Sequence, residues 1–324
     1  MKRVAIASLL ISLACFAFSQ AGGSNPSQTA PQGNSTQPQG STQQQPASSA
    51  QSAPAKHPPQ AKTQPEFDAF KAASANQDPA ALEKAADDFA TKFPDSELRV
   101  ILYKTAMRGH QSANNADKML EMGHKALAID ADDPESLVDV AEVLTERTRD
   151  TDLDKDQRLG EARKDAEKAL QTVNTDILFP ATTPPDNVQK YKDLLTSSAY
   201  SILGTLDFNQ GNFAAAQGNF QKSIDAYPQQ PDPVTVLRLS LSLDRQNKYP
   251  EALTVANRAV ELTQESTPAG NLARRERDRL LQLTGGKPTG AGASGATPPA
   301  HPAPSSTPPN TTGNPGQGTT PPKN

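Results

Sequence analysis

The 324-residue sequence has no tryptophan, 5% aromatic residues and only 35% hydrophobic residues, but 29 prolines. This is too little apolar material for one large core, so part of the chain is expected to be disordered. The deficit lies at the two ends. Residues 20–64 contain no acidic or aromatic residue and no Leu, Ile or Val, and residues 284–324 are rich in Thr, Pro and Gly. We expect both to be solvated tethers, because they cannot bury enough surface to offset chain entropy.

Acidic residues are also missing from both ends, and this concentrates negative charge in the middle. The charged residues outside 65–283 are Lys2, Arg3, Lys56, Lys62, Lys287 and Lys323. Of 32 Lys+Arg and 36 Asp+Glu, the middle therefore keeps 32 − 6 = 26 basic residues against 36 acidic ones, a formal charge of −10. Such a charge argues against nucleic acid as the main partner and against a basic membrane-surface domain.

The chain has one cysteine, Cys15, inside an apolar run over residues 4–18 that follows two basic residues. This pattern and the sequence Ala17-Phe18-Ser19 predict a signal peptide over residues 1–19 and export to the periplasm or beyond. The mature chain would then lack a thiol, which excludes a disulfide, a cysteine nucleophile and a thiolate metal site. Two alternatives stay open: an uncleaved anchor, and a lipoprotein attached through Cys15, which alone would give membrane contact.

Motifs that carry enzymatic chemistry are missing. The sequence has no GxGxxG, no phosphate-binding loop and no GxSxG, and no two of its four histidines have the i, i+4 spacing of a helical metal site. Acidic residues alternate over 150–156, but Lys155 stands where a calcium loop has its glycine. We therefore predict no catalytic residue, cofactor or metal. The enzyme alternative has only these loop acids, His110 and His124 as candidates.

Large and small residues alternate with a regular spacing in 34 residues that begin at Ser197. The positions that define the pattern are Tyr200, Leu203, Gly204, Gly211, Phe213, Ala216, Phe220, Ser223 and Pro228. Three of its small residues, at places 8, 20 and 27, fall where two antiparallel helices would approach most closely. Glycine at place 15 suits the left-handed turn at the end of the first helix. An acid, Asp207, stands at place 11 instead of an apolar residue, and Phe208 next to it is a candidate substitute.

The same frame recurs, which predicts four copies near residues 100–131, 134–173, 197–230 and 233–264. The fourth copy has Ala252 and Ala259 at its small-residue places, whereas the first has Met107 and Met119 there. The second has a longer inter-helix loop. An irregular helix pair over 66–93 precedes the copies, residues 174–186 interrupt them, and a capping helix is expected over 268–283. Its leucines would pack inward, and its arginines would face water.

This frame resembles the tetratricopeptide repeat (TPR), a pair of antiparallel helices. The resemblance implies an all-α fold: a right-handed α-solenoid of about four helix hairpins with flanking helices, in a helical domain over 65–283. Each pair cannot bury its apolar stripe alone, so stacking stabilises the array and creates a concave surface. The resemblance also implies a non-enzymatic, exported scaffold or adaptor of a bacterial type that binds a protein or peptide.

In this family, ligands lie against the concave face of the first helices. The corresponding positions here are Lys104, Arg108, Gln111, Glu135, Val138, Glu142, Glu146, Ser201, Thr205, Asn209, Leu237, Leu241 and Arg245. We expect Lys104 and Arg108 to be exposed, so that reversing their charges costs little stability. The family's carboxylate clamp is not reproduced, because Asp139, Ser198 and Ile202 stand where its residues would continue. The face is compatible with a peptide or a helix but does not indicate which one.

Overall fold

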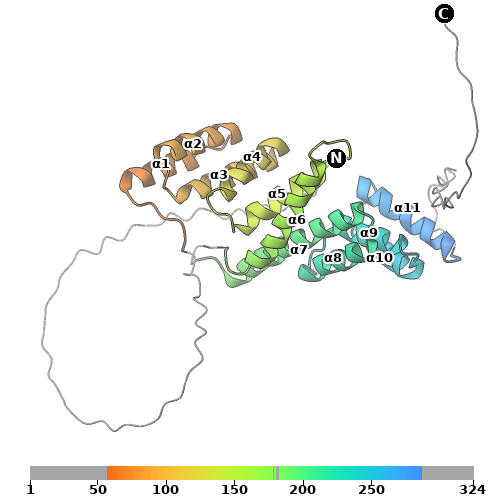
Figure 1. Cartoon of the computed structure of the whole chain (residues 1–324). Coiled ribbons are helices and arrows are strands. Elements are labelled where there is room, and N and C mark those ends of the chain that lie inside the picture. Colours follow the sequence, from red (N-terminus) through yellow and green to blue (C-terminus); the bar gives the residue numbers. More distant parts are fainter. Residues whose placement is uncertain (1–56, 178, 180–181, 287–324) are drawn as a thin grey trace, which may run out of the picture. The chain divides into compact units, whose positions relative to one another are not determined.

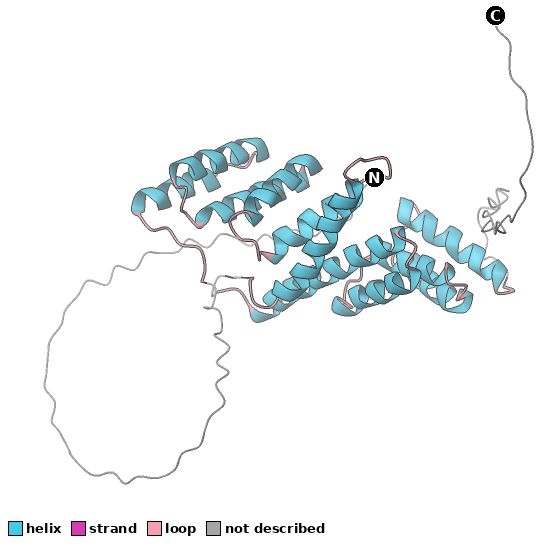
Figure 2. Ribbon diagram, in the orientation of Figure 1, coloured by secondary structure: helices cyan, strands magenta, loops and turns pink. Residues whose placement is uncertain are grey.

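The computed structural model describes residues 57–177, 179 and 182–286. Within these ranges the chain forms eleven α-helices and no strand (Figures 1 and 2). Helices that follow one another in sequence pack against one another, which confirms the predicted all-α solenoid. The predictions for the signal peptide, Cys15, residues 20–56 and residues 287–324 lie outside the described residues.

The helices form five successive pairs and one further helix. They are α1 (Gln64–Ser74), α2 (Pro79–Lys92), α3 (Leu98–Ser112), α4 (Ala116–Leu127), α5 (Pro134–Arg147), α6 (Lys155–Thr172), α7 (Pro185–Asn209), α8 (Phe213–Ala226), α9 (Pro233–Asp244), α10 (Tyr249–Glu261) and α11 (Pro268–Leu283). The pairs α3–α4, α5–α6, α7–α8 and α9–α10 correspond to the four copies of the repeat. No helix of the described chain is long and apolar enough to cross a membrane.

Several helices begin at residues that cap their first turn. The side chains of Asp78, Asp133, Asp232 and Thr267 each accept a hydrogen bond from a backbone N–H of the helix that follows, and proline occupies the first turn of each of these helices. Capping satisfies N–H groups that have no partner within the helix, and proline loses nothing at a position where its missing N–H is not needed. These short signals explain why the boundaries lie where they do.

The first helix of the third copy, α7, is longer than the repeat frame predicts. It has 25 residues and begins at Pro185, twelve residues before the copy was expected to start at Ser197. The predicted interruption over 174–186 therefore ends where α7 begins, and the residues from Pro185 to Thr196 add about three helical turns before the predicted start of the copy. In this extension Leu195 is buried, and Tyr191 packs against the core formed by α5, α6 and α7. The extension thus adds a layer that the repeat alone does not supply.

The closest approach within the third copy is between Gly204 of α7 and Phe220 of α8. A Cβ atom at position 204 would lie 2.6 Å from two ring atoms of Phe220, a side chain with no exposed surface. Ala216 is also fully buried, and the hydroxyl of Ser197 donates a hydrogen bond of 2.8 Å to the carbonyl of Ser223. Small residues therefore allow these two helices to approach.

The first copy solves the same packing problem with the residue sizes exchanged. Met107 stands at place 8, where the third copy has Gly204, and Gly123 stands at place 24, where the third copy has Phe220. A Cβ at Gly123 would lie 3.3 Å from the sulfur of Met107 and 2.5 Å from a methyl group of Val140. The methionine is therefore no defect of this copy, because a glycine on the opposite helix makes room for it.

At position 11 of the third copy, the acid Asp207 is accommodated by polar partners, and its neighbour Phe208 supplies apolar packing, as predicted. Asp207 itself is buried, and its carboxylate accepts hydrogen bonds from Arg163 of α6 and Asn219 of α8, both 2.7 Å long. Phe208 is half-buried, packs against the core of α8 to α11 and makes an edge-to-face contact with Phe213. A hydrogen-bonded ion pair thus takes the place of apolar packing at the junction of the second and third copies.

The side chains of α11 are oriented differently from the prediction. Leu280 is fully buried, but Leu272 and Leu283 are 56% and 51% exposed. Of the four arginines expected to face water, Arg275 is exposed. Arg274 donates to the carbonyl of Gly270, Arg277 is bonded to Asp278, and Arg279 is bonded to Asp244 of α9 and to Glu276. The face of α11 that is buried therefore differs from the predicted one, and it packs against the pair α9–α10.

Candidate functional site

The residues predicted to line a concave face come from α3, α5, α7 and α9, and we call their shared surface the first-helix face. Ten of them are half-buried or exposed: Lys104, Arg108, Gln111, Glu142, Glu146, Ser201, Thr205, Asn209, Leu241 and Arg245. Glu135, Val138 and Leu237 are buried, and the side chain of Lys104 is only 19% exposed. The structure therefore divides the predicted set into accessible residues and residues that hold the helices together.

Lys104 and Arg108 of α3 are bound to acids of the next copy. Lys104 Nζ lies 2.6 Å from Asp133 Oδ1 and 3.0 Å from Glu135 Oε2. Arg108 donates from Nε and a terminal nitrogen to the two oxygens of Glu135, at 2.5 and 2.6 Å. Arg108 is exposed as predicted, but Lys104 is not. Because the contacts of both residues join α3 to α5, reversal of their charges is now expected to cost stability.

The opposite charges in this network shift the pKa values of Lys104 and Glu135. Burial alone would lower the pKa of Lys104, but the charges of Glu135 and Asp133 hold it above its ordinary value. Burial would raise the pKa of Glu135, but Lys104 and Arg108 lower it to about 2. Lys104 and Glu135 are therefore both charged at neutral pH, and their role here is to connect two copies.

Asp139 lies one turn further along α5 and behaves differently. It is 8% exposed and makes no side-chain hydrogen bond to any residue in the part of the chain that the structure describes. Burial and the nearby charges of Glu135 and Glu142 raise its pKa well above the ordinary value, and Arg108 opposes this only in part. Burial and neighbouring negative charges both favour the neutral form of a carboxyl group.

The extension of α7 completes the surroundings of these acids. Tyr191 lies near Glu135, Asp139 and Arg108, and burial, followed by the Glu135 charge, raises the pKa of its hydroxyl. The ring of Phe179 packs edge-to-face on Tyr191, with centroids 5.7 Å apart. The first-helix face of the first two copies is thus lined by residues from α3, α5 and α7.

Between the third and fourth copies the first-helix face has hydrogen bonds between hydroxyl groups and further polar side chains that are exposed. Ser201 of α7 and Thr235 of α9 share a hydrogen bond of 2.8 Å, and Arg238 donates to Thr205 at 2.9 Å. Beyond these contacts, Asn209 and Arg245 are exposed and Leu241 is half-buried. This half of the face retains side chains that a partner can reach.

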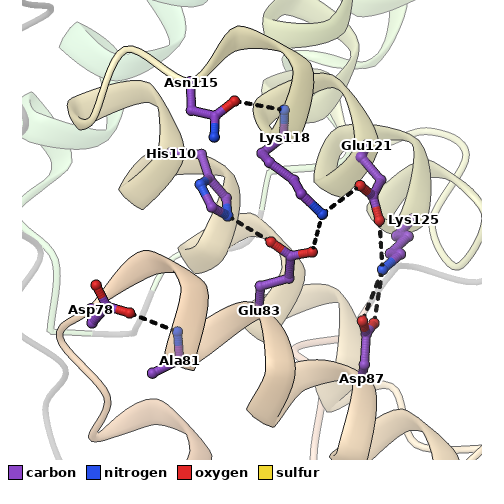
Figure 3. A network of polar contacts seen from close by, with 9 residues as sticks. All are labelled: Asp78, Ala81, Glu83, Asp87, His110, Asn115, Lys118, Glu121 and Lys125. Carbon is purple, nitrogen blue, oxygen red and sulfur yellow. Dashed lines mark hydrogen bonds and ion pairs between the residues drawn. The ribbon is translucent and has the colours of Figure 1, made fainter.

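A charge network joins α2, α3 and α4 (Figure 3). Glu83 of α2 accepts a hydrogen bond from Lys118 of α4 at 2.5 Å and lies 3.0 Å from Nε2 of the buried His110. Lys118 Nζ also lies 2.9 Å from a carboxylate oxygen of Glu121, and Lys125 Nζ lies 3.1 Å from Glu121 and 2.9 Å from Asp87. Opposite charges alternate along this network, and its contacts between helices hold α2 of the first pair against α3 and α4 of the second.

A similar contact joins α4 to α6. His124 Nε2 lies 2.8 Å from Glu161 Oε1, and Asp165 lies buried one turn beyond Glu161. Burial, followed by the Glu161 charge, raises the pKa of Asp165 to about 6. In residues 57–177, 179 and 182–286, no group of three His, Cys, Asp or Glu side chains is placed to hold a metal ion. Both histidines of the helical region therefore serve contacts between helices.

Three residues near the first-helix face were missed or misassigned from the sequence. Tyr191 was missed because the frame for the third copy began at Ser197, although Tyr191 and Leu195 have the i, i+4 spacing of a helix that continues upstream. Asp139 was considered only as a departure from the family's clamp. Arg238 was not considered because it lies between the expected positions on α9.

No protein-family model and no curated protein sequence matches this chain. Solved structures do match it, among them the assembly chaperone of RpL4 (Acl4), residues 1–338. That match has 13% sequence identity and a TM-score of 0.35, and it covers 68% of this chain and 96% of the other. Likeness at this level bears on neither activity nor partner.

Proposed function

We propose that this protein is a non-enzymatic scaffold of the TPR type that binds a protein or peptide through its first-helix face. The observation that carries the proposal is the division within that face. Stacking of the pairs is already satisfied by buried residues, while Asn209, Leu241 and Arg245 remain accessible on α7 and α9. Accessible apolar and polar groups on neighbouring rigid helices suit an extended or helical segment of a partner.

The TPR assignment is supported by the agreement between frame and packing. Gly204 lies at the closest helix approach, and Gly211 has a φ of +80° at the turn between α7 and α8. The fourth copy repeats the arrangement, with Ala252 and Ala259 fully buried and the hydroxyl of Ser240 bonded to the carbonyl of Ala252. A spacing that places small residues at these contacts in two copies is typical of the repeat.

Export belongs to the same proposal and rests on the sequence of residues 1–19. A mass spectrum of the mature N-terminus tests it. An unmodified start at Gln20 supports a secreted or periplasmic protein, whereas an acylated Cys15 replaces this proposal with that of an outer-membrane lipoprotein. A chain that keeps residues 1–19 contradicts both.

Site-specific photocrosslinking in native cells tests the binding face. A photoreactive residue at Asn209 should capture a protein, whereas the same residue at Arg258, an exposed position on α10, should not. Equal capture at both positions would count against the first-helix face. Loss of every crosslink on deletion of residues 284–324, with the helices intact, would assign recruitment to the tail instead.

A further inference from the structure

Two arginines and a leucine lie along one side of α9, and we call them the arginine stripe: Arg238, Leu241 and Arg245. Their spacing of i, i+3 and i+7 places them on one face of a helix. Arg245 directly follows the last residue of α9 but keeps helical backbone angles, with a φ of −62° and a ψ of −17°. Arg238 and Leu241 are half-buried and Arg245 is exposed, so a partner can reach all three from solvent.

The arginine stripe lies beside α7 and the start of α8. Arg238 donates a hydrogen bond of 2.9 Å to Thr205 of α7, and the guanidinium of Arg245 lies 5.8 Å from the ring centroid of Phe213. Phe213 and Gln246 also line an open hollow beside the turn between α7 and α8. A hydroxyl group and an aromatic ring thus orient the two guanidinium groups without neutralising their charge.

The two arginines of the stripe form no ion pair with a carboxylate in the part of the chain that the structure describes. The acids of the third and fourth copies that lie in α7 and α9 are already bound elsewhere. Asp207 of α7 binds Arg163 of α6, and Asp244 of α9 binds Arg279 of α11, at 2.7 and 2.5 Å. The positive charge of the stripe is therefore available to a partner.

The occupant that complements this charge is acidic, and the two ends of the chain do not supply it. The segments outside residues 65–283 contain no Asp or Glu. In the first two copies, Lys104 and Arg108 are already neutralised by acids, so that part of the first-helix face attracts an acidic segment less. Charge complementarity thus directs an acidic segment of another protein to α9.

We propose that the arginine stripe binds an acidic helix of the partner, with two carboxylates seven residues apart and an apolar side chain between them. This rests on the proposed function and specifies the chemical class of the partner. Seven residues rise about 10.5 Å along any α-helix, so such carboxylates match the separation of Arg238 and Arg245 when the two helices lie side by side. Paired hydrogen bonds from guanidinium to carboxylate give the contact its direction, and Leu241 packs on the apolar side chain.

Fluorescence anisotropy with the full chain tests the proposal. The probe is a labelled alanine-rich helical peptide that carries two glutamates seven residues apart and a leucine three residues after the first. One control peptide has glutamines in place of the glutamates, and the other has its glutamates five residues apart, on different sides of the helix. We expect the probe to bind and both controls to bind about tenfold more weakly. The helical domain is acidic overall, so general electrostatic attraction does not account for binding of an acidic peptide.

Substitutions distinguish the stripe from other arginines. Arg238→Gln and Arg245→Gln should each weaken binding of the probe about tenfold. Arg258→Gln is the matched control, because it removes an exposed arginine from α10, and it should leave binding unchanged.

Equal effects of Arg245→Gln and Arg258→Gln would overturn the proposal, as would unchanged binding in both stripe variants. Equal binding of the probe and either control peptide, or no binding of the probe, would also overturn it. The photocrosslinking at Asn209 uses no added peptide. Capture there without binding of the probe would therefore retain the binding face and remove only the acidic helix.

Discussion

Gly204 and Phe220 lie so close across the third helix pair that a single methyl group at Gly204 would come within 2.6 Å of the ring. The ring of Phe220 on α8 therefore fills the space that a side chain at position 204 of α7 would need. This contact shows how a small residue on one helix of a pair allows the other helix to come close.

The first prediction is that Gly204→Ala lowers the free energy of unfolding by about 1–3 kcal/mol, because it overpacks this contact. The higher helix propensity of alanine, about 1 kcal/mol, acts in the opposite direction and makes the sign informative. Urea unfolding followed by circular dichroism measures the change. Gly218→Ala is the control, since nothing lies within 4 Å of a Cβ there, and it should stabilise slightly. Equal effects of the two substitutions would contradict the packing argument.

The second prediction concerns the connection between α3 and α5. Lys104→Met should destabilise the protein by about 3–5 kcal/mol, because Asp133 and Glu135 would remain buried without their ammonium partner. Lys84→Met removes an exposed ion pair with Asp88 and should change stability by less than about 1 kcal/mol. Thermal unfolding of both variants provides the comparison. A Lys104 variant as stable as the Lys84 variant would show that the network contributes nothing to folding.

The third prediction follows from the pKa of Asp165, which is about 6 in the folded protein and about 3.9 in an unfolded chain. Between these values the unfolded state releases a proton that the folded state keeps, so this group lowers stability as the pH rises from about 4 to 6. Asp165→Asn should therefore stabilise the protein above pH about 6 and have little effect near pH 4. Urea unfolding at both pH values, taken as the difference from wild type, cancels groups common to both proteins. A pH-independent difference would contradict the raised pKa.

The fourth prediction separates two leucines of α11. Leu280→Ala should cost about 2–5 kcal/mol because the side chain is fully buried, whereas Leu272→Ala should change stability by no more than about 0.5 kcal/mol. Denaturant midpoints of the two variants measure the contrast. If Leu272→Ala is the more costly substitution, the helix packs through the other side.

The helical repeat could be predicted because its signals are local. Gly204, Ala216 and Phe220 lie within one helix pair, so their sizes and spacing describe a contact between neighbours in sequence. Gly211 marks a turn by its need for positive φ, and the structure gives it a φ of +80°. Such features need no knowledge of how one pair packs on the next.

Contacts between pairs could not be predicted in the same way. Lys104 meets Glu135 across 31 residues, and the frame treated both only as positions on a surface. The extension of α7 was missed because its residues follow a proline-rich connection and match no place in the repeat. On α11, periodicity gave a helix but not its rotation, since the neighbours that set the rotation belong to α9 and α10.

The exchange of sizes between the first and third copies also restricts which helices can pair during folding. Met107 of α3 fits against Gly123 of α4, and Gly204 of α7 fits against Phe220 of α8. If α3 paired with α8, methionine and phenylalanine would compete for one space; if α7 paired with α4, two glycines would face each other across a void. Both mispaired hairpins are disfavoured by sterics alone. In a chain built from similar repeats, the positions of these two glycines thus disfavour domain-swapped and out-of-register assemblies.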